Sequence, residues 1–348
     1  MKLLANQFAE KTPRLTLHCI SHKTLRNHKA DAFVFEYCGE LYLIDGGIYE
    51  ATYVFDYLLA IRKRFLRDHA ALVDDPSCKL RVNWIISHYH SDHVGAVIEK
   101  MIPNPFFELG DVYSPPDSEI AEIYQMKDRD GDYNMRPLLK AALSKLTAPA
   151  YTVHDIGFGV ENRFTVSTQS GIGREVKFTF LPPPFDFGEK WYMDYTVDLY
   201  QTKTGGLERL PVTTVNSASV WVLAEFAGKK ILFTGDTTKR EKHMYSEGLD
   251  FMMEAYADEI GKLDVLKYVH HGYARNHALP AMMSFAPEIL LVSKTDSPIP
   301  ELVEKRYPDT STKVMNVADE TLVITCGYDE VTGEPLPLAY EWHEEIVK

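Results

Sequence analysis

Hydrophobic and polar positions alternate along two separate parts of the chain, and each part predicts β-strands followed by helices. In the first part, β-branched and aromatic residues predict strands at 14–20, 32–37 and 41–45, and 82–87 is a wholly apolar strand of the kind buried on both faces. Apolar residues at helical spacing predict a helix within 50–70, another from about Val94, and helical structure over 117–147. In the second part we expect strands at 151–156, 176–182, 219–226, 230–236, 265–270, 288–293, 314–318 and 321–328, and helices at 238–259, 278–285 and 299–306.

This order of elements indicates two similar halves, each of which contributes a sheet and its covering helices. We therefore expect a single domain over residues 1–348 that forms a four-layer αββα sandwich, with two mixed β-sheets inside and helices outside. An irregular insert at about 183–207 interrupts the second half. Its aromatic-rich portion, 182–200, either packs onto the surface or closes over a site as a lid.

The segment SHYHSDHVGA (87–96) concentrates three histidines and an aspartate directly after a buried strand. His88 and His90 are two residues apart, so a strand places both imidazoles on one side, and Asp92 and His93 follow on the turn into the next helix. Imidazole and carboxylate are ligands of zinc and iron. Because four such ligands exceed what one open catalytic site needs, the segment predicts two divalent metal ions that share a site.

The run H-x-H-x-D-H at 88–93 resembles the signature of the metallo-β-lactamase-fold hydrolase superfamily, whose fold is the αββα metallo-β-lactamase sandwich. LIDGG (43–47), LFTGD (232–236) and DVLKYVHHGYARNH (264–277) resemble further motifs of that superfamily, and the resemblance is closest to its ComEC/Rec2-like branch. It implies that Asp45 supports the metal loop through hydrogen bonds and that Asp236 bridges the two metals. The metal ligands that it implies are His88, His90, Asp92, His93, Asp236 and His270.

Two adjacent histidines, His270 and His271, stand at the end of the strand predicted at 265–270. Neighbouring residues on a strand point in opposite directions. Because His270 directly ends that strand, we expect it to be the closing metal ligand. His271 then faces the substrate, either as a proton donor to the leaving oxygen or as a phosphate contact. The alternative is that the second histidine only holds the loop 272–277.

One departure from the superfamily pattern concerns the first metal. Many members supply a third histidine between the signature and the bridging aspartate, and the only histidine in that interval here is His154, for which we expect a structural role. Asn216 and Ser219 instead form the Asn-x-x-Ser pattern of the ComEC-like branch, and we expect them to contact substrate or a metal-bound water. The first metal is therefore expected to bind more weakly than the second.

Composition narrows the classes of function. The net charge of −13 argues against binding of long nucleic acids, although bound metals still allow a phosphate-bearing small molecule. The four cysteines have no CxxC spacing, and no stretch has the apolar length of a signal peptide core or of a membrane span. These features predict a cytoplasmic protein without a membrane partner, and they leave its oligomeric state open.

The function that these features predict is hydrolysis by hydroxide formed on the two metals, with zinc the first choice and manganese or iron as alternatives. Asp92 is expected to orient the nucleophile. Resemblance to the ComEC-like branch favours a phosphodiesterase for a small organic phosphodiester or a short nucleotide. A lactonase or thioesterase is the second hypothesis, and an iron-dependent oxidoreductase on the same fold is the alternative from another class.

Overall fold

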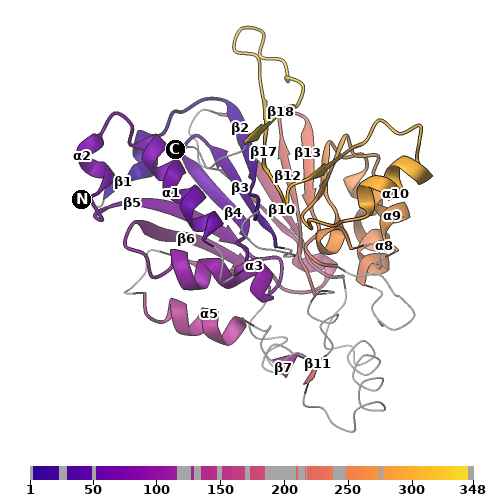
Figure 1. The fold of residues 1–348 in the computed structure, drawn as a ribbon, viewed down its shortest axis with the longest axis horizontal. Coiled ribbons are helices and arrows are strands. Elements are labelled where there is room, and N and C mark those ends of the chain that lie inside the picture. The colour runs from indigo at the N-terminus through magenta and orange to yellow at the C-terminus, as the bar shows by residue number, and fades with distance from the viewer. Residues whose placement is uncertain are drawn as a thin grey trace.

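Two β-sheets face each other in the computed structural model, and helices cover their outer faces (Figure 1). The structure describes residues 3–22, 30–48, 52–115, 127–128, 135–146, 151–168, 173–184, 209–210, 216, 218–237, 248–273 and 277–343. Most of the predicted insert at 183–207, much of the helical segment predicted at 117–147 and the first part of the helix predicted at 238–259 lie outside the described residues.

The first sheet comes mainly from the N-terminal half and takes two strands from the C-terminus. Among the described residues it has nine strands, in the order β18-β17-β2-β3-β4-β5-β6-β8, with the short β1 beside β5. Their bounds are β1 Leu3–Leu4, β2 Arg14–Cys19, β3 Ala32–Tyr37, β4 Glu40–Asp45, β5 Cys78–Ile85, β6 Phe107–Ser114, β8 Val153–Asp155, β17 Thr321–Gly327 and β18 Ala339–His343.

The second sheet comes from the C-terminal half. It has seven strands in the described residues, in the order β16-β15-β14-β13-β12-β10-β9. These are β9 Phe164–Ser167, β10 Lys177–Leu181, β12 Trp221–Phe226, β13 Lys229–Phe233, β14 Val265–Lys267, β15 Ile289–Val292 and β16 Lys313–Asn316. A separate two-stranded pairing joins β7 Lys127–Asp128 to β11 Arg209–Leu210. Both large sheets mix parallel and antiparallel pairs, as the αββα prediction requires.

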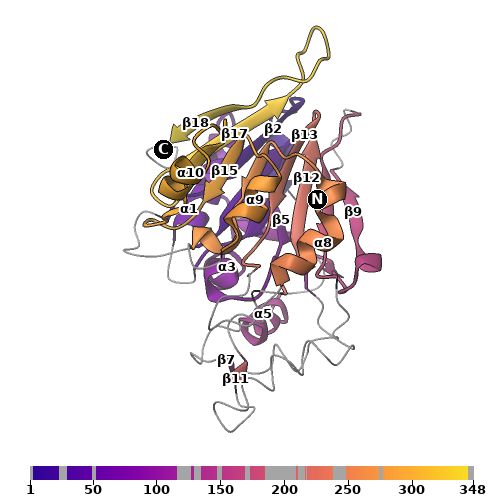
Figure 2. The ribbon, with the colours of Figure 1, turned by 90° about the vertical axis from the view of Figure 1, so that its right-hand side faces the viewer.

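Helices form the two outer layers. Figure 1 shows α1 Tyr53–Phe65, α3 Ser91–Ala96 and α5 Arg136–Leu143 outside the first sheet, and α2 Ala70–Val73 lies near its edge. In Figure 2, α8 Gly248–Ile260, α9 Leu279–Ser284 and α10 Ile299–Arg306 lie in front of the second sheet. Buried apolar residues accordingly form three clusters, one between the sheets and one under each helical layer. The predicted four-layer sandwich is confirmed.

Parallel strand pairs bring several chain segments to one end of the sandwich. β4 runs parallel to β5 in the first sheet, and β13, β14 and β15 run parallel to one another in the second. The carboxyl ends of these strands therefore lie at a common end, where loops from both sheets can build one site. All the predicted metal motifs follow these strand ends.

Among the differences from the sequence prediction, two lie next to the predicted metal motifs. The strand β6 was not predicted because Gly110 and Asp111 interrupt its apolar pattern. The register between β5 and β6 shifts beside this point, and a Cβ on Gly110 would lie 2.3 Å from Oδ1 of Asn83, so only glycine fits there. The strand β14 ends at Lys267, three residues before the predicted end at His270.

No helix in the described part of the chain is long and apolar enough to span a bilayer.

Trp84 provides a test of how the core supports the site. Its side chain is fully buried, and its Nε1 donates a hydrogen bond of 2.9 Å to the carbonyl oxygen of Asp45, at the end of β4. Trp84→Phe should lower the free energy of unfolding by about 2 kcal/mol, because it removes buried volume and leaves that carbonyl without its donor. Urea denaturation measures the change. Trp342→Phe, the same substitution at a side chain that is 39% exposed, should change it by less than about 0.5 kcal/mol. Equal effects of the two substitutions would contradict this role of Trp84.

Candidate metal centre

Histidines and aspartates from four strand ends meet between the two sheets. Asp45 ends β4, the segment 87–93 follows β5, Asp236 follows β13, and His271 follows β14. One ligand atom from each of Asp31, His93, Asp236 and His271 lies within 4.8 Å of the others, and all four residues are buried. The structure therefore brings together groups that are up to 240 residues apart in the sequence.

Asp45 holds the histidine segment in place. Its Oδ1 accepts a 2.9 Å hydrogen bond from the backbone N–H of Ser87, and its Oδ2 accepts one from the Ser87 hydroxyl at 2.9 Å. The same Oδ2 lies 2.9 Å from Nδ1 of His93. Asp45 has a φ of +57°, a left-handed conformation that aspartate tolerates, and it turns the carboxylate away from the sheet toward the loop. This is the arrangement that the resemblance implied for Asp45.

His88 and His90 form a pair beside this cluster. Nε2 of His88 lies 3.1 Å from Nδ1 of His90, and Nδ1 of His88 lies near the hydroxyls of Ser87 (3.0 Å) and Ser219 (3.3 Å). Burial, together with the neighbouring imidazoles of His93 and His90, holds the pKa of His88 well below its usual range. His88 is therefore neutral, which is the form of imidazole that binds a metal.

His270 and His271 adopt a conformation that the sequence pattern does not reveal. Both have left-handed backbone angles, with φ of +47° and +59°, in a tight turn that follows β14. Because they are not on a strand, they do not point to opposite sides. Nε2 of His271 lies 3.1 Å and Nε2 of His270 lies 3.7 Å from the same oxygen, Oδ2 of Asp236.

Ligand atoms of four residues lie close enough together for one cation to be shared among them. Nε2 of His93 lies 3.3 Å from Oδ2 of Asp236, and the Asp92 carboxylate lies 3.9 Å from Nε2 of His93 and 3.5 Å from Nε2 of His271. Ligand atoms about 2.0–2.2 Å from a tetrahedral zinc ion are roughly 3.3–3.6 Å apart. The geometry therefore favours Asp92, His93, Asp236 and His271 as one ligand set, with His271 in the place that the strand pattern had assigned to His270.

The charges of the cluster also favour a cation. Nδ1 of His93 faces Asp45, so a neutral His93 that donates from Nδ1 presents a lone pair at Nε2 to the Asp236 carboxylate. Burial alone would lower the pKa of His93, but Asp236 and Asp45 raise it well above its usual range. Burial likewise lowers the pKa of His271, and Asp236 and Asp31 raise it to about 9. These shifts show that the carboxylates favour positive charge at the point where the two Nε2 atoms meet, and a divalent metal supplies such charge.

Asp31 and Lys267 also belong to this cluster, and the sequence analysis missed both. Asp31 directly precedes β3, and Lys267 is the last residue of β14. They form an ion pair, and each side chain is 1% exposed. Asp31 belongs to no motif singled out in the sequence, and Lys267 lies within DVLKYVHHGYARNH (264–277) but was given no role there. The signal that could have found them is a charged residue beside or within an apolar strand.

Ser219 lies beside the histidine pair, and the backbone carbonyl of Asn216 accepts a hydrogen bond from the N–H of Ser219. The Ser219 hydroxyl accepts a 3.1 Å hydrogen bond from the backbone N–H of Asp236 and contacts His88. A Cβ on Gly235 would lie 2.7 Å from this hydroxyl, so glycine is required for the close approach. Asn216 is 1% exposed, and its side-chain amide has no hydrogen-bond partner among the described residues. Contact of either residue with substrate stays a prediction.

His154 lies on β8, at the edge of the first sheet, outside this cluster. Its ring stacks on Tyr113 at a centroid distance of 4.7 Å, and its Nε2 lies 3.7 Å from Oδ1 of Asp111. The side chain is 40% exposed. These contacts are those of the structural histidine that the sequence analysis expected.

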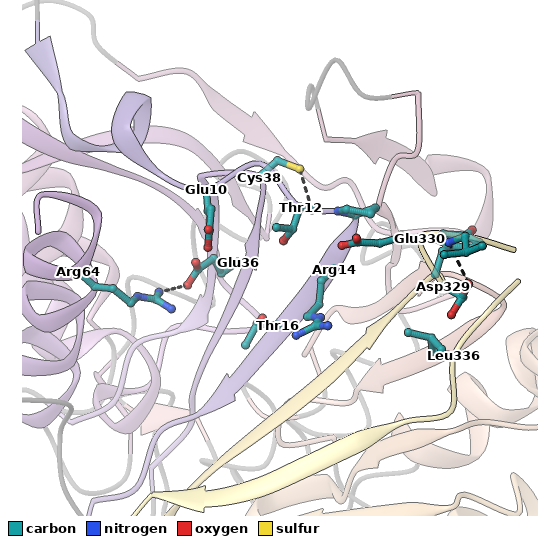
Figure 3. A pocket seen from close by; sticks show the side chains of 13 residues that line it. Glu10, Thr12, Arg14, Thr16, Glu36, Cys38, Arg64, Asp329, Glu330 and Leu336 are labelled. Carbon is teal, nitrogen blue, oxygen red and sulfur yellow. Dashed lines mark hydrogen bonds and ion pairs between the residues drawn. The ribbon is translucent and has the colours of Figure 1, made fainter. Parts of the chain in front are cut away.

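A hollow of about 640 Å³ opens elsewhere on the first sheet (Figure 3). Its lining includes Arg14 on β2, Glu36 on β3 and Asp329 beyond β17, and Figure 3 shows the ion pair of Glu36 with Arg64 at its side. Charges of both signs line it, and it contains none of the predicted site residues. The metal cluster is therefore the candidate site.

Comparison with known proteins gives structural likeness alone. No protein-family profile matches the sequence, and no curated protein sequence matches it. The chain is similar to the metallo-β-lactamase fold protein YhfI from Bacillus subtilis, with 12% identity, a TM-score of 0.45 and coverage of 88% of this chain and 98% of that chain. It is also similar to the short form of human tRNase Z (11% identity, TM-score 0.38, coverage 87% and 92%) and to the Rm3 metallo-β-lactamase (9%, 0.34, 88% and 88%). At these identities, the roles of residues in this chain rest on its own geometry.

The metal content of two variants shows which of the adjacent histidines is a metal ligand. His271→Ala should weaken metal binding at least about tenfold, because it removes a buried imidazole whose Nε2 faces Asp236 and Asp92. His270→Ala should leave the metal content of the purified protein close to that of the wild type. Elemental analysis after dialysis against a weak chelator measures both. A protein that loses metal on removal of His270 and keeps it on removal of His271 would restore the assignment made from the sequence.

Proposed function

Because the chain has the metallo-β-lactamase fold, we propose that it is a hydrolase that uses two divalent metal ions and that its substrate is a small phosphodiester. The observation that carries the proposal is the meeting of Asp92, His93, Asp236 and His271, which make contacts of 3.1–3.9 Å, beside the buried pair His88 and His90. A site with so many buried ligands has the composition of a metal centre and differs from an ordinary polar core.

The ligands divide into two groups around Asp236. Asp92, His93 and His271 would hold one ion, and His88 and His90 would hold the other, with Asp236 shared between them. Within the described ranges, the second group offers two imidazoles, because His154 lies elsewhere. Asn216, with its buried amide, is the side chain that could complete it. Zinc suits these imidazole and carboxylate ligands, and manganese or iron could also bind them.

Two divalent ions at these positions would supply a water of lowered pKa and positive charge toward the substrate. The side chains of this chain would do the remaining work. Asp92 has a 10% exposed carboxylate at the open side of the cluster, where it can orient the attacking water and accept its proton. His270 is the more exposed of the two adjacent histidines, and its ring lies 4.9 Å from that of Tyr273. It is therefore the candidate proton donor to the leaving oxygen, the role that the sequence analysis gave to His271.

A phosphodiester suits this site better than a neutral ester does. Hydrolysis of a phosphodiester develops charge on several phosphoryl oxygens, and fixed positive charges stabilise that charge most when water is excluded. A lactone or thioester develops charge on one oxygen and would use the two cations less fully. The net charge of −13 further favours a small substrate over a nucleic acid polymer.

A substrate panel tests the reaction class. Protein loaded with zinc or manganese should hydrolyse bis(p-nitrophenyl) phosphate faster than it hydrolyses p-nitrophenyl phosphate, lactones or thioesters. Asp236→Ala should lower that activity by about 1000-fold or more, because the carboxylate shared by the two ions is lost. Lactone hydrolysis in the absence of phosphodiesterase activity would support the lactonase alternative. Redox-active iron as the only metal that binds would support the oxidoreductase alternative.

The role of His270 is tested by the leaving group. His270→Ala should lower kcat about 100-fold for an alkyl phosphodiester, whose leaving alkoxide needs a proton, and much less for a nitrophenyl ester. His343→Ala, which removes a partly exposed histidine paired with Glu341 on β18, serves as the matched control and should change neither rate. Equal losses for both substrates in His270→Ala would contradict an acid role.

A further inference from the structure

Lys267 is a buried cation in direct contact with the metal centre. Its side chain is 1% exposed at the end of β14. Its ammonium pairs with Oδ2 of Asp31, donates a 2.8 Å hydrogen bond to the carbonyl oxygen of Gly235, and lies 3.5 Å from Oδ1 of Asp236. The ammonium thus makes one hydrogen bond to the backbone and two charge contacts with carboxylate oxygens. The ammonium is therefore held in one position, and a buried charge requires such compensation.

Asp31 connects this cation to the closing histidine. Its Oδ1 accepts a 2.5 Å hydrogen bond from the hydroxyl of Ser293 and lies 3.2 Å from Nδ1 of His271. Its backbone carbonyl accepts from the N–H groups of Gly46 and Gly47, directly after β4. Asp31 thus lies between the two sheets and fixes His271 as Asp45 fixes His93.

Lys267 also determines which oxygen of Asp236 faces the imidazoles. Oδ1 of Asp236 is the atom near the ammonium, whereas Oδ2 lies 3.1 Å from Nε2 of His271 and 3.3 Å from Nε2 of His93. A carboxylate in a buried site would otherwise be able to rotate and present both oxygens to cations. With one oxygen held, a single oxygen remains directed at the metal positions.

We propose that Lys267 and Asp31 are positioning residues of the metal centre: Lys267 holds Asp236 so that Oδ2 alone binds metal, and Asp31 directs Nε2 of His271 to the same point. This inference rests on the proposed metal site and does not depend on which substrate is hydrolysed. Asp31 is itself kept from metal binding, because both of its oxygens are engaged, with Lys267 on one side and with Ser293 and His271 on the other. The ion pair also lets Asp31 orient His271 without adding net negative charge to the cluster.

The double variant Asp31→Leu/Lys267→Met tests this role. Replacing both partners of a buried ion pair by apolar side chains of similar size often preserves folding, whereas removing one partner leaves an unpaired buried charge. The matched control is Asp264→Leu/Lys229→Met. It removes a half-buried ion pair, 3.0 Å between the charged atoms, at the amino ends of β13 and β14, whereas the metal site lies at their carboxyl ends. Both proteins are first compared with the wild type by circular dichroism and thermal unfolding.

Titration of the metal-free proteins with Co²⁺, followed by visible absorption, gives the deciding measurement. The Asp31/Lys267 variant should bind Co²⁺ at least tenfold more weakly and show a changed spectrum, because the coordination around Asp236 and His271 is altered. The Lys229/Asp264 variant should bind within twofold of the wild type with the same spectrum. Wild-type affinity and spectrum in the Asp31/Lys267 variant would overturn the proposal, even if its thermal stability were lowered.

If the double variant does not fold, Ser293→Ala tests the role of Asp31 instead. It removes the hydroxyl that donates to Asp31 and that also lies 3.1 Å from Nδ1 of His271, and it should weaken Co²⁺ binding several-fold. An unchanged Co²⁺ titration in this variant would overturn the role of Asp31. Because no substrate is used, a protein that binds Co²⁺ as expected but cleaves no phosphodiester would contradict the proposed function and leave this inference supported.

Discussion

Burial of several carboxylates at one point is the constraint on which the rest of the site depends. Asp31, Asp45, Asp92 and Asp236 all lie at the same end of the sandwich, and each is less than 10% exposed. Carboxylates that are removed from water must be paired with positive charge or with hydrogen-bond donors. The chain satisfies this requirement with Lys267, with imidazoles and with backbone and hydroxyl donors. The remaining demand for positive charge lies where His93 and His271 meet Asp236, which is the proposed metal position.

The backbone accepts strain to bring these groups together. Asp45, His270 and His271 all have left-handed φ values, and glycine stands at position 235, where the Ser219 hydroxyl comes close. Such conformations in residues other than glycine cost about 1 kcal/mol or more each and persist only where surrounding structure enforces them. Here the strand ends enforce them, since β4, β5, β13 and β14 are anchored in three buried apolar clusters. The sandwich thereby fixes the positions of the loop residues that form the site.

Sequence patterns predicted the layers and the histidine segment because both follow short-range rules. Alternation along strands and the H-x-H-x-D-H spacing are visible within ten residues, and Asp45 and Asp236 stand at the ends of apolar strands. The pair Asp31 and Lys267 was not predictable in this way, because the partners are 236 positions apart and Asp31 has no local motif. Lys267 lies within the motif at 264–277, but lysine is not a residue type that the pattern marks as a metal ligand. The strand pattern could not decide between His270 and His271 for a different reason. The alternation rule applies only on a strand, and β14 ends at Lys267, before either histidine.

Charge balance connects the buried pair to the class of substrate. Since Lys267 cancels the charge of Asp31, three carboxylates remain at the site, those of Asp45, Asp92 and Asp236. With neutral imidazoles and with the bound water still protonated, the two proposed divalent ions would exceed these carboxylates by one positive charge. A phosphodiester is a monoanion, so its binding would neutralise the centre, whereas a neutral lactone would leave the excess charge buried without compensation. Without Lys267, the same two ions would be neutralised by protein carboxylates alone, and the site would lose its attraction for an anion. The lysine that positions Asp236 thus also sets the charge by which the centre would select its substrate.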